Sequence, residues 1–103
     1  MRILERRKYP RYGFQSDVEL LIGSDVQAAF ITDLSMGGMF IATTAPLHVG
    51  TACTARLLLD PPLLLSCVVR RVIPGRGMGV SFEGLATAAR ARLEKVLVSL
   101  ARN

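Results

Sequence analysis

The stretch that decides the fold is QAAFITDLSMGGMFIAT, residues 27–43. Apolar and β-branched residues form a run at each end of it, over residues 27–33 and 39–43. Both runs have the length and composition of short β-strands. Because Gly37 and Gly38 interrupt the apolar pattern between them, the stretch predicts two strands joined by a tight turn.

Four similar runs flank this pair, and turn residues separate them. The clearest turns are Gly23-Ser24-Asp25, Asp60-Pro61-Pro62 and Pro74-Gly75-Arg76-Gly77. No segment between two runs is long enough for a helical crossover, so antiparallel pairing is expected, in a barrel or a sandwich. The six predicted strands cover residues 18–22, 27–33, 39–43, 51–59, 63–72 and 78–82.

The end of the chain changes to a helical period. Apolar residues recur at spacings of three and four, with charged residues between them, which predicts an amphipathic helix over residues 85–101. Its apolar face must be covered, either by the barrel or by a partner helix. The apolar positions are Leu85, Ala89, Leu93, Val96, Leu97 and Leu100.

Size and composition fit one globular domain of 103 residues, of which half are hydrophobic. We expect residues 1–14 to form a flexible basic arm and residues 15–83 the barrel. No signal peptide is evident, and the apolar stretch 57–65 is broken by Asp60 and two prolines, so a soluble, cytoplasmic protein is expected. Cys53 and Cys67 lie in apolar strand-like runs, which favours two buried thiols, although a disulfide stays possible.

Positive charge gathers at the N-terminus. The net charge is +5, and the first eleven residues hold Arg2, Arg6, Arg7, Lys8 and Arg11. Residues 12–55 hold no Lys or Arg, but they hold four acidic residues. A basic arm on a locally acidic body suggests anion binding; a solvated tail is the alternative.

Two short polar motifs carry the chemistry. In Arg7-x-x-x-Arg11, Pro10 disfavours a helix, so the guanidinium groups are free to fold around a ligand, and each can bond a phosphate or the O6/N7 edge of guanine. In Asp33-x-Ser35-x-x-Gly38, the carboxylate can accept from the N–H groups of guanine. Ser35 adds a hydroxyl, and Gly38 allows a positive φ or a close backbone approach. A plain turn in which Asp33 and Ser35 bond local backbone is the alternative.

The two motifs together, in this order and spacing, resemble the PilZ domain family. The likeness continues through Leu47-x-x-Gly50, the run 68–72, the run 77–82 and the closing helix. It implies a six-stranded antiparallel β-barrel with a C-terminal α-helix, and a receptor for the second messenger cyclic di-GMP. The residues that match the ligand-binding positions are Arg7, Arg11, Asp33, Ser35 and Gly38.

Arg6 precedes the first motif, and in the family an arginine at this position tends to accompany two intercalated ligand molecules. The resemblance therefore implies that two molecules of cyclic di-GMP bind per chain.

The overall expectation is a stand-alone receptor that is not an enzyme, contains no metal or cofactor, and signals to a downstream protein. Ligand binding is expected to order the arginine arm. An adaptor that binds no nucleotide and a small-barrel nucleic-acid binder are the alternatives. His48 is expected at the surface. Of Arg70 and Arg71, neighbours in a strand, one should face outward. Tyr9, Tyr12 and Phe14 lie near the arginines, and one of them is a candidate to stack on the ligand, with Phe14 expected in the core instead.

Overall fold

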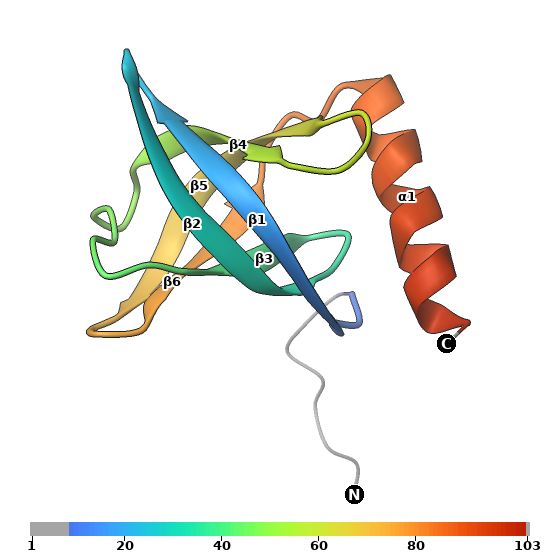
Figure 1. Cartoon of the computed structure of the whole chain (residues 1–103), viewed down its shortest axis with the longest axis horizontal. Helices are drawn as coiled ribbons and strands as arrows, with labels where there is room; N and C mark the ends of the chain where they lie inside the picture. Colours follow the sequence, from blue (N-terminus) through green and yellow to red (C-terminus); the bar gives the residue numbers. More distant parts are fainter. Residues whose placement is uncertain (1–8, 103) are drawn as a thin grey trace, which may run out of the picture.

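The computed structural model describes residues 9–102, and in this range six strands precede one helix (Figure 1). Each strand pairs antiparallel with its neighbours, in the order β1-β2-β3-β6-β5-β4, and β4 closes the barrel on β1. The predicted antiparallel barrel with a C-terminal helix is confirmed. The elements are β1 (Tyr12–Ile22), β2 (Asp25–Leu34), β3 (Gly38–Ala42), β4 (Ala52–Leu57), β5 (Leu63–Ile73), β6 (Gly77–Phe82) and α1 (Thr87–Ala101).

The first strand is longer than the sequence suggests. β1 begins at Tyr12, inside the segment 1–14 expected to be an arm, and pairs with β2 from Tyr12 opposite Leu34 to Ile22 opposite Asp25. Exposed residues such as Gly13, Gln15 and Asp17 break the apolar pattern in its first half. The described part of the arm is therefore short, consisting of residues 9–11, and residues 1–8 lie outside the described range.

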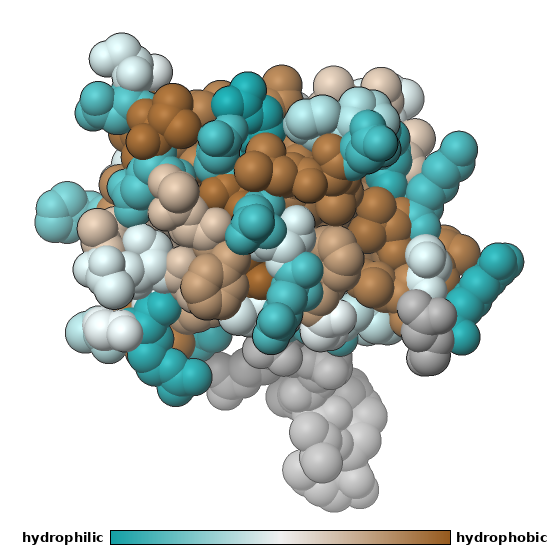
Figure 2. All heavy atoms as spheres, viewed as in Figure 1, coloured by the Kyte–Doolittle hydropathy of each residue, from teal (hydrophilic) through white to brown (hydrophobic). Residues whose placement is uncertain are grey.

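The core fills the barrel interior, because alternate residues of each strand point inward. α1 adds Leu93 and Leu97 to this core and packs against β1 and β5, so the barrel covers the apolar face of the helix. Figure 2 shows apolar residues gathered between the front strands and the helix. The fully buried large side chains include Leu20, Ile31, Leu34, Met39, Ile41, Leu57, Leu65, Met78 and Leu93.

Two irregularities in strand pairing place side chains on the outside of the barrel. The register of β2 against β3 shifts between Ile31 and Asp33, and that of β5 against β6 shifts between Val69 and Arg71. A bulge of this kind inserts a residue and interrupts the alternation of faces. As a result Arg70 and Arg71 are both exposed, which corrects the expectation that they alternate.

The two cysteines face each other across β4 and β5 and are buried and free. Burial raises the pKa of Cys53; for Cys67, burial and then the neighbouring Cys53 raise the pKa to about 12. Within residues 9–102, no helix has the length and apolar character that crossing a membrane requires.

These thiols predict a loss of stability at high pH. The unfolded thiols ionise near their ordinary value of 9.0, whereas Cys67 in the folded state stays neutral up to about 12. Ionisation of Cys67 therefore leaves the free energy of unfolding unchanged below pH 9. Between pH 9 and 12 it lowers that free energy, by at most about 1.4 kcal/mol for each pH unit. Urea unfolding at a series of pH values measures this fall, and it should be smaller in Cys67→Ala; an equal fall in both proteins would contradict the assignment.

Candidate functional site

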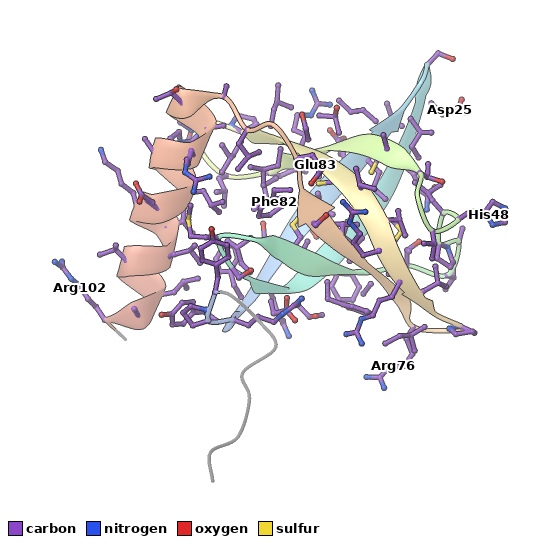
Figure 3. All side chains as sticks on the ribbon, turned by 180° about the vertical axis from the view of Figure 1, so that it is seen from behind. Asp25, His48, Arg76, Phe82, Glu83 and Arg102 are labelled. Carbon is purple, nitrogen blue, oxygen red and sulfur yellow. The ribbon has the colours of Figure 1, made fainter. Side chains whose placement is uncertain are left out.

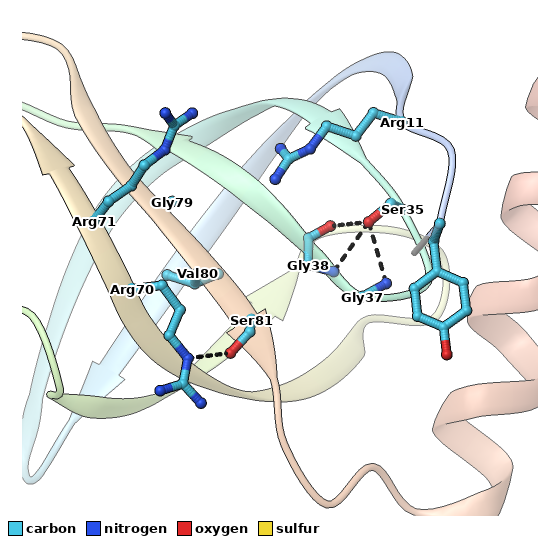
Figure 4. Close-up of a pocket in the computed structure, with 10 residues that line it drawn as sticks. Arg11, Ser35, Gly37, Gly38, Arg70, Arg71, Gly79, Val80 and Ser81 are labelled. Carbon is cyan, nitrogen blue, oxygen red and sulfur yellow. Dashed lines mark hydrogen bonds between the residues drawn. The ribbon is translucent and has the colours of Figure 1, made fainter. Parts of the chain in front are cut away.

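A pocket of about 400 Å³ opens on the outer face of the barrel, at the end where β1 begins (Figure 4). Four parts of the chain form it: the residues before β1, the β2–β3 turn, the arginine pair of β5, and β6. The lining residues are Tyr9, Arg11, Ser35, Gly37, Gly38, Arg70, Arg71, Gly79, Val80 and Ser81.

Glycines of β3 and β6 form part of the pocket floor. Gly38 of β3 pairs with Ser81 of β6, and Phe40 pairs with Gly79, so two positions on this face carry no side chain. A Cβ on Gly38 would lie 2.0 Å from the carbonyl oxygen of Val80, and a Cβ on Gly79 would lie 3.2 Å from Nε of Arg71. The glycines therefore let the backbone of β6 approach β3 closely and let the side chain of Arg71 lie over β6.

Arg11 and Asp33 join the two sequence motifs. Nη1 of Arg11 donates to Oδ1 of Asp33 at 2.8 Å, and the backbone N–H of Phe40 donates to the same oxygen at 3.1 Å. Both side chains of the ion pair are about one quarter exposed. Nε of Arg11 is buried and has no hydrogen-bond partner within residues 9–102. The Arg11 side chain therefore carries one buried donor that no described residue satisfies.

Ser35 shapes the turn between β2 and β3. Its Oγ donates to the carbonyl oxygen of Gly38 at 3.0 Å and accepts from the N–H groups of Gly37 and Gly38, each at 3.1 Å (Figure 4). One hydroxyl has one hydrogen and two lone pairs, so these three bonds use its full capacity. Ser35 lines the pocket, but within the described range its hydroxyl bonds only the backbone of Gly37 and Gly38. This is the plain turn that the sequence suggests as the alternative to a ligand contact of Ser35.

We predict that Ser35→Ala destabilises the protein. The substitution removes three bonds and leaves the buried N–H of Gly38 and the part-buried N–H of Gly37 without a side-chain acceptor, which should lower the free energy of unfolding by about 2 kcal/mol. Urea unfolding measures the change, with the exposed Ser66→Ala of β5 as the matched control. Equal stability of the two variants would contradict this account of the turn.

Arg70 and Arg71 form a cationic wall opposite Arg11 (Figure 4). Nε of Arg70 donates to Oγ of Ser81 at 2.8 Å, and its Nη2 lies 3.4 Å from a carboxylate oxygen of Glu83. Arg71 has no carboxylate partner within the described range. The sequence predicts that one of these two arginines faces outward, but it does not place both in the pocket. The bulge in β5 that exposes both residues leaves no signal in the sequence.

The predicted site residues are only partly brought together. Arg11, Ser35 and Gly38 line the pocket, while Asp33 lies beside it and lines a neighbouring pocket. Gly38 is not among the glycines with positive φ; it permits the close approach of β3 to β6 instead. Arg6 and Arg7 lie outside the described residues. Tyr9 lines the pocket, where its ring would lie 2.9 Å from a Cβ on Gly37.

Two further sequence expectations concern histidine and metals. His48 is exposed in the loop between β3 and β4, away from this pocket (Figure 3). Residues 9–102 contain no group of three or more His, Cys, Asp or Glu side chains that could hold a metal ion.

A family model for the PilZ domain matches residues 5–99. The chain belongs to the PilZ domain family. Its match spans the pocket, the barrel and nearly all of α1. A search of curated proteins by sequence found no match to this PilZ domain.

Solved structures share the fold. The PilZ domain of YcgR from Escherichia coli, solved with c-di-GMP, is 16% identical with a TM-score of 0.81, and the match covers 95% of this chain and 93% of that one. MotI/DgrA, the Bacillus subtilis inhibitor of motility, is 18% identical with a TM-score of 0.80, covering 93% and 51%.

A third match is the PilZ domain of CeSA from a cellulose-synthesizing bacterium. It is 25% identical with a TM-score of 0.71, covering 89% of this chain and 98% of that one. The present chain spans about half the length of MotI/DgrA and of the transcription regulatory factor MrkH.

Proposed function

We propose that this PilZ domain is a cytoplasmic receptor for cyclic di-GMP, without catalytic activity of its own, that signals to a downstream protein partner. The observation that carries the proposal is the Arg11–Asp33 ion pair, which joins the two motifs at the edge of a pocket lined by three arginines.

The chemistry of the pocket suits a guanine nucleotide. The pocket has a volume of about 400 Å³, and the guanidinium groups of Arg11, Arg70 and Arg71 supply donors for phosphate oxygens and for the O6/N7 edge of guanine. The side chain of Arg11 is about one quarter exposed, so its guanidinium group can contact a ligand in the pocket while it keeps its ion pair with Asp33. The solved complexes of YcgR and MrkH with c-di-GMP support the choice of ligand by likeness of fold.

The residues before Tyr9 complete the proposed site. Arg7 would join Arg11 around the phosphates, and Arg6 would contact a second, intercalated ligand molecule. Binding would neutralise the clustered positive charge of this segment, order it against the barrel, and so change the surface presented to the partner.

Calorimetric titration tests the proposal. Cyclic di-GMP should bind the wild-type protein at micromolar concentration or below, whereas cyclic di-AMP, which lacks the guanine edges, should bind at least about 100-fold more weakly. A stoichiometry of two that falls to one in Arg6→Ala would support the paired ligand. Equal binding of both dinucleotides, or of neither, would overturn the proposed function.

Hydrogen exchange tests the conformational part. Amides of residues 2–8 should exchange more slowly when cyclic di-GMP is bound, while amides of the distant β4–β5 core should be unchanged. Equal exchange of residues 2–8 in the two states, at saturating ligand, would refute ordering without refuting binding.

A further inference from the structure

A second pocket, of about 450 Å³, lies next to the first on the outer face of the barrel. Arg71 lines both pockets and stands between them. We call the second pocket the outer subsite and define it by six of its lining residues: Phe30, Asp33, Phe40, Arg71, Ile73 and Arg76.

The register of the strands explains why these side chains meet. Asp33 of β2 pairs with Phe40 of β3, Phe40 pairs with Gly79 of β6, and Gly79 pairs with Arg71 of β5, which makes one row across four strands. Because Gly79 has no side chain, Arg71 lies over β6, with its Cγ 3.3 Å from the position of a Cβ there.

Aromatic and apolar side chains make the surface of the outer subsite. Phe30 is 48% exposed and Phe40 is partly buried, and Ile73 lies at the end of β5. Exposed aromatic rings offer faces on which a nucleic-acid base can stack.

Charged groups at its rim are available to a ligand. Arg71 and Arg76 have no carboxylate partner among the residues that the structure describes. Figure 3 shows Arg76 pointing outward from the β5–β6 turn. The turn is fixed, since the N–H of Arg76 donates to the carbonyl of Ile73 and its own carbonyl accepts from the N–H of Thr43.

Asp33 adds an acceptor. Its Oδ1 already accepts from Arg11 and Phe40, but Oδ2 accepts from no donor within residues 9–102. A carboxylate oxygen next to arginines and aromatic rings matches guanine, whose N1–H and N2–H groups are donors and whose O6 and N7 are acceptors.

The geometry points to the outer subsite as a second guanine-nucleotide subsite, in which the aromatic pair stacks on the base and Arg71 and Arg76 contact phosphate or the O6/N7 edge. The inference rests on the proposed function and extends it from Asp33 of the second motif to Phe30, Phe40, Arg71 and Arg76, which lie outside both motifs. The guanine held in this subsite belongs either to the same cyclic dinucleotide or to a second molecule.

Calorimetric titration of cyclic di-GMP into Arg76→Ala and Phe30→Ala distinguishes these sources. If one molecule spans both pockets, each substitution should weaken its binding by about tenfold and leave the stoichiometry unchanged. The reason is that each substitution removes one charge-assisted or stacking contact. A stoichiometry that falls from two to one, with the affinity of the remaining site unchanged, assigns the subsite to a second molecule. Both results support the subsite.

Matched controls keep the test specific. Arg90→Ala removes an exposed arginine from α1, and Val26→Ala removes an exposed apolar side chain from β2; neither residue lines either pocket. Thermal unfolding verifies that each variant is folded. The subsite is overturned if Arg76→Ala and Phe30→Ala bind as the wild type does, or if the controls lose as much affinity. If the wild-type protein itself binds no cyclic di-GMP, the proposed function fails as well.

Discussion

Replacing Gly38 with alanine should destabilise the barrel strongly, although the change adds only one methyl group. The new Cβ would lie 2.0 Å from the carbonyl oxygen of Val80 and 3.2 Å from Cα of Ser81, both of them backbone atoms of β6. Backbone in a closed barrel cannot rotate away as a side chain can, so β3 and β6 must separate. We expect the free energy of unfolding to fall by about 4 kcal/mol, a large share of the total for a small domain.

Gly13→Ala is the matched control for this experiment. Gly13 also lies in a strand, but its Cβ would meet no atom within 4 Å, and its φ is not positive. Its unfolding free energy should stay within about 0.5 kcal/mol of the wild type. Urea unfolding compares the two variants. A Gly38→Ala protein as stable as Gly13→Ala would show that the approach of β3 to β6 is looser than the structure indicates.

Replacing Arg11 with alanine should weaken the binding of cyclic di-GMP by about 100-fold or more, the sum of two lost charge-assisted contacts. One loss is direct, since the guanidinium group lines the pocket. The other acts through Asp33, whose Oδ1 loses the charged donor at 2.8 Å and is then held, among the described residues, only by the backbone N–H of Phe40 at 3.1 Å. Arg11→Lys should restore little, because an ammonium group cannot replace the planar fork of donors.

The Arg56–Glu19 pair provides the control for Arg11. It joins β4 to β1 with comparable exposure, and neither residue lines the pocket. Calorimetry should show wild-type affinity in Arg56→Ala. Asp33→Ala should weaken binding too, and the double variant Arg11→Ala/Asp33→Ala should lose less than the sum, because the two residues act through one ion pair. Full additivity would mean that the pair does not work as a unit.

The number of strands and their approximate positions along the chain could be predicted because their signals are local. Apolar runs of strand length, separated by Gly and Pro turns, appear in the sequence and in the structure alike. The first half of β1 could not be predicted in this way, since Gly13, Gln15 and Asp17 face solvent on a strand that has little apolar pattern there.

The candidate site was predictable only where its residues are close in sequence. The turn from Asp33 to Gly38 is a local motif, and the structure shows it as a hydrogen-bonded unit around Ser35. The contributions of Arg71 and Gly79 depend on pairing between β5 and β6 and on a bulge, which are non-local features. The pairing of Arg11 with Asp33 spans 22 positions, and the sequence likewise does not predict it as a contact.

An NMR titration of isotope-labelled protein with cyclic di-GMP tests the central claim most directly, because each backbone amide reports its own surroundings. We expect the amides of Gly37, Gly38, Gly79 and Ser81 to shift and saturate together, while those on the exposed face of α1 stay unchanged. Shifts confined to α1, or no saturable shift at millimolar ligand, would contradict binding between the arginines and the glycine floor.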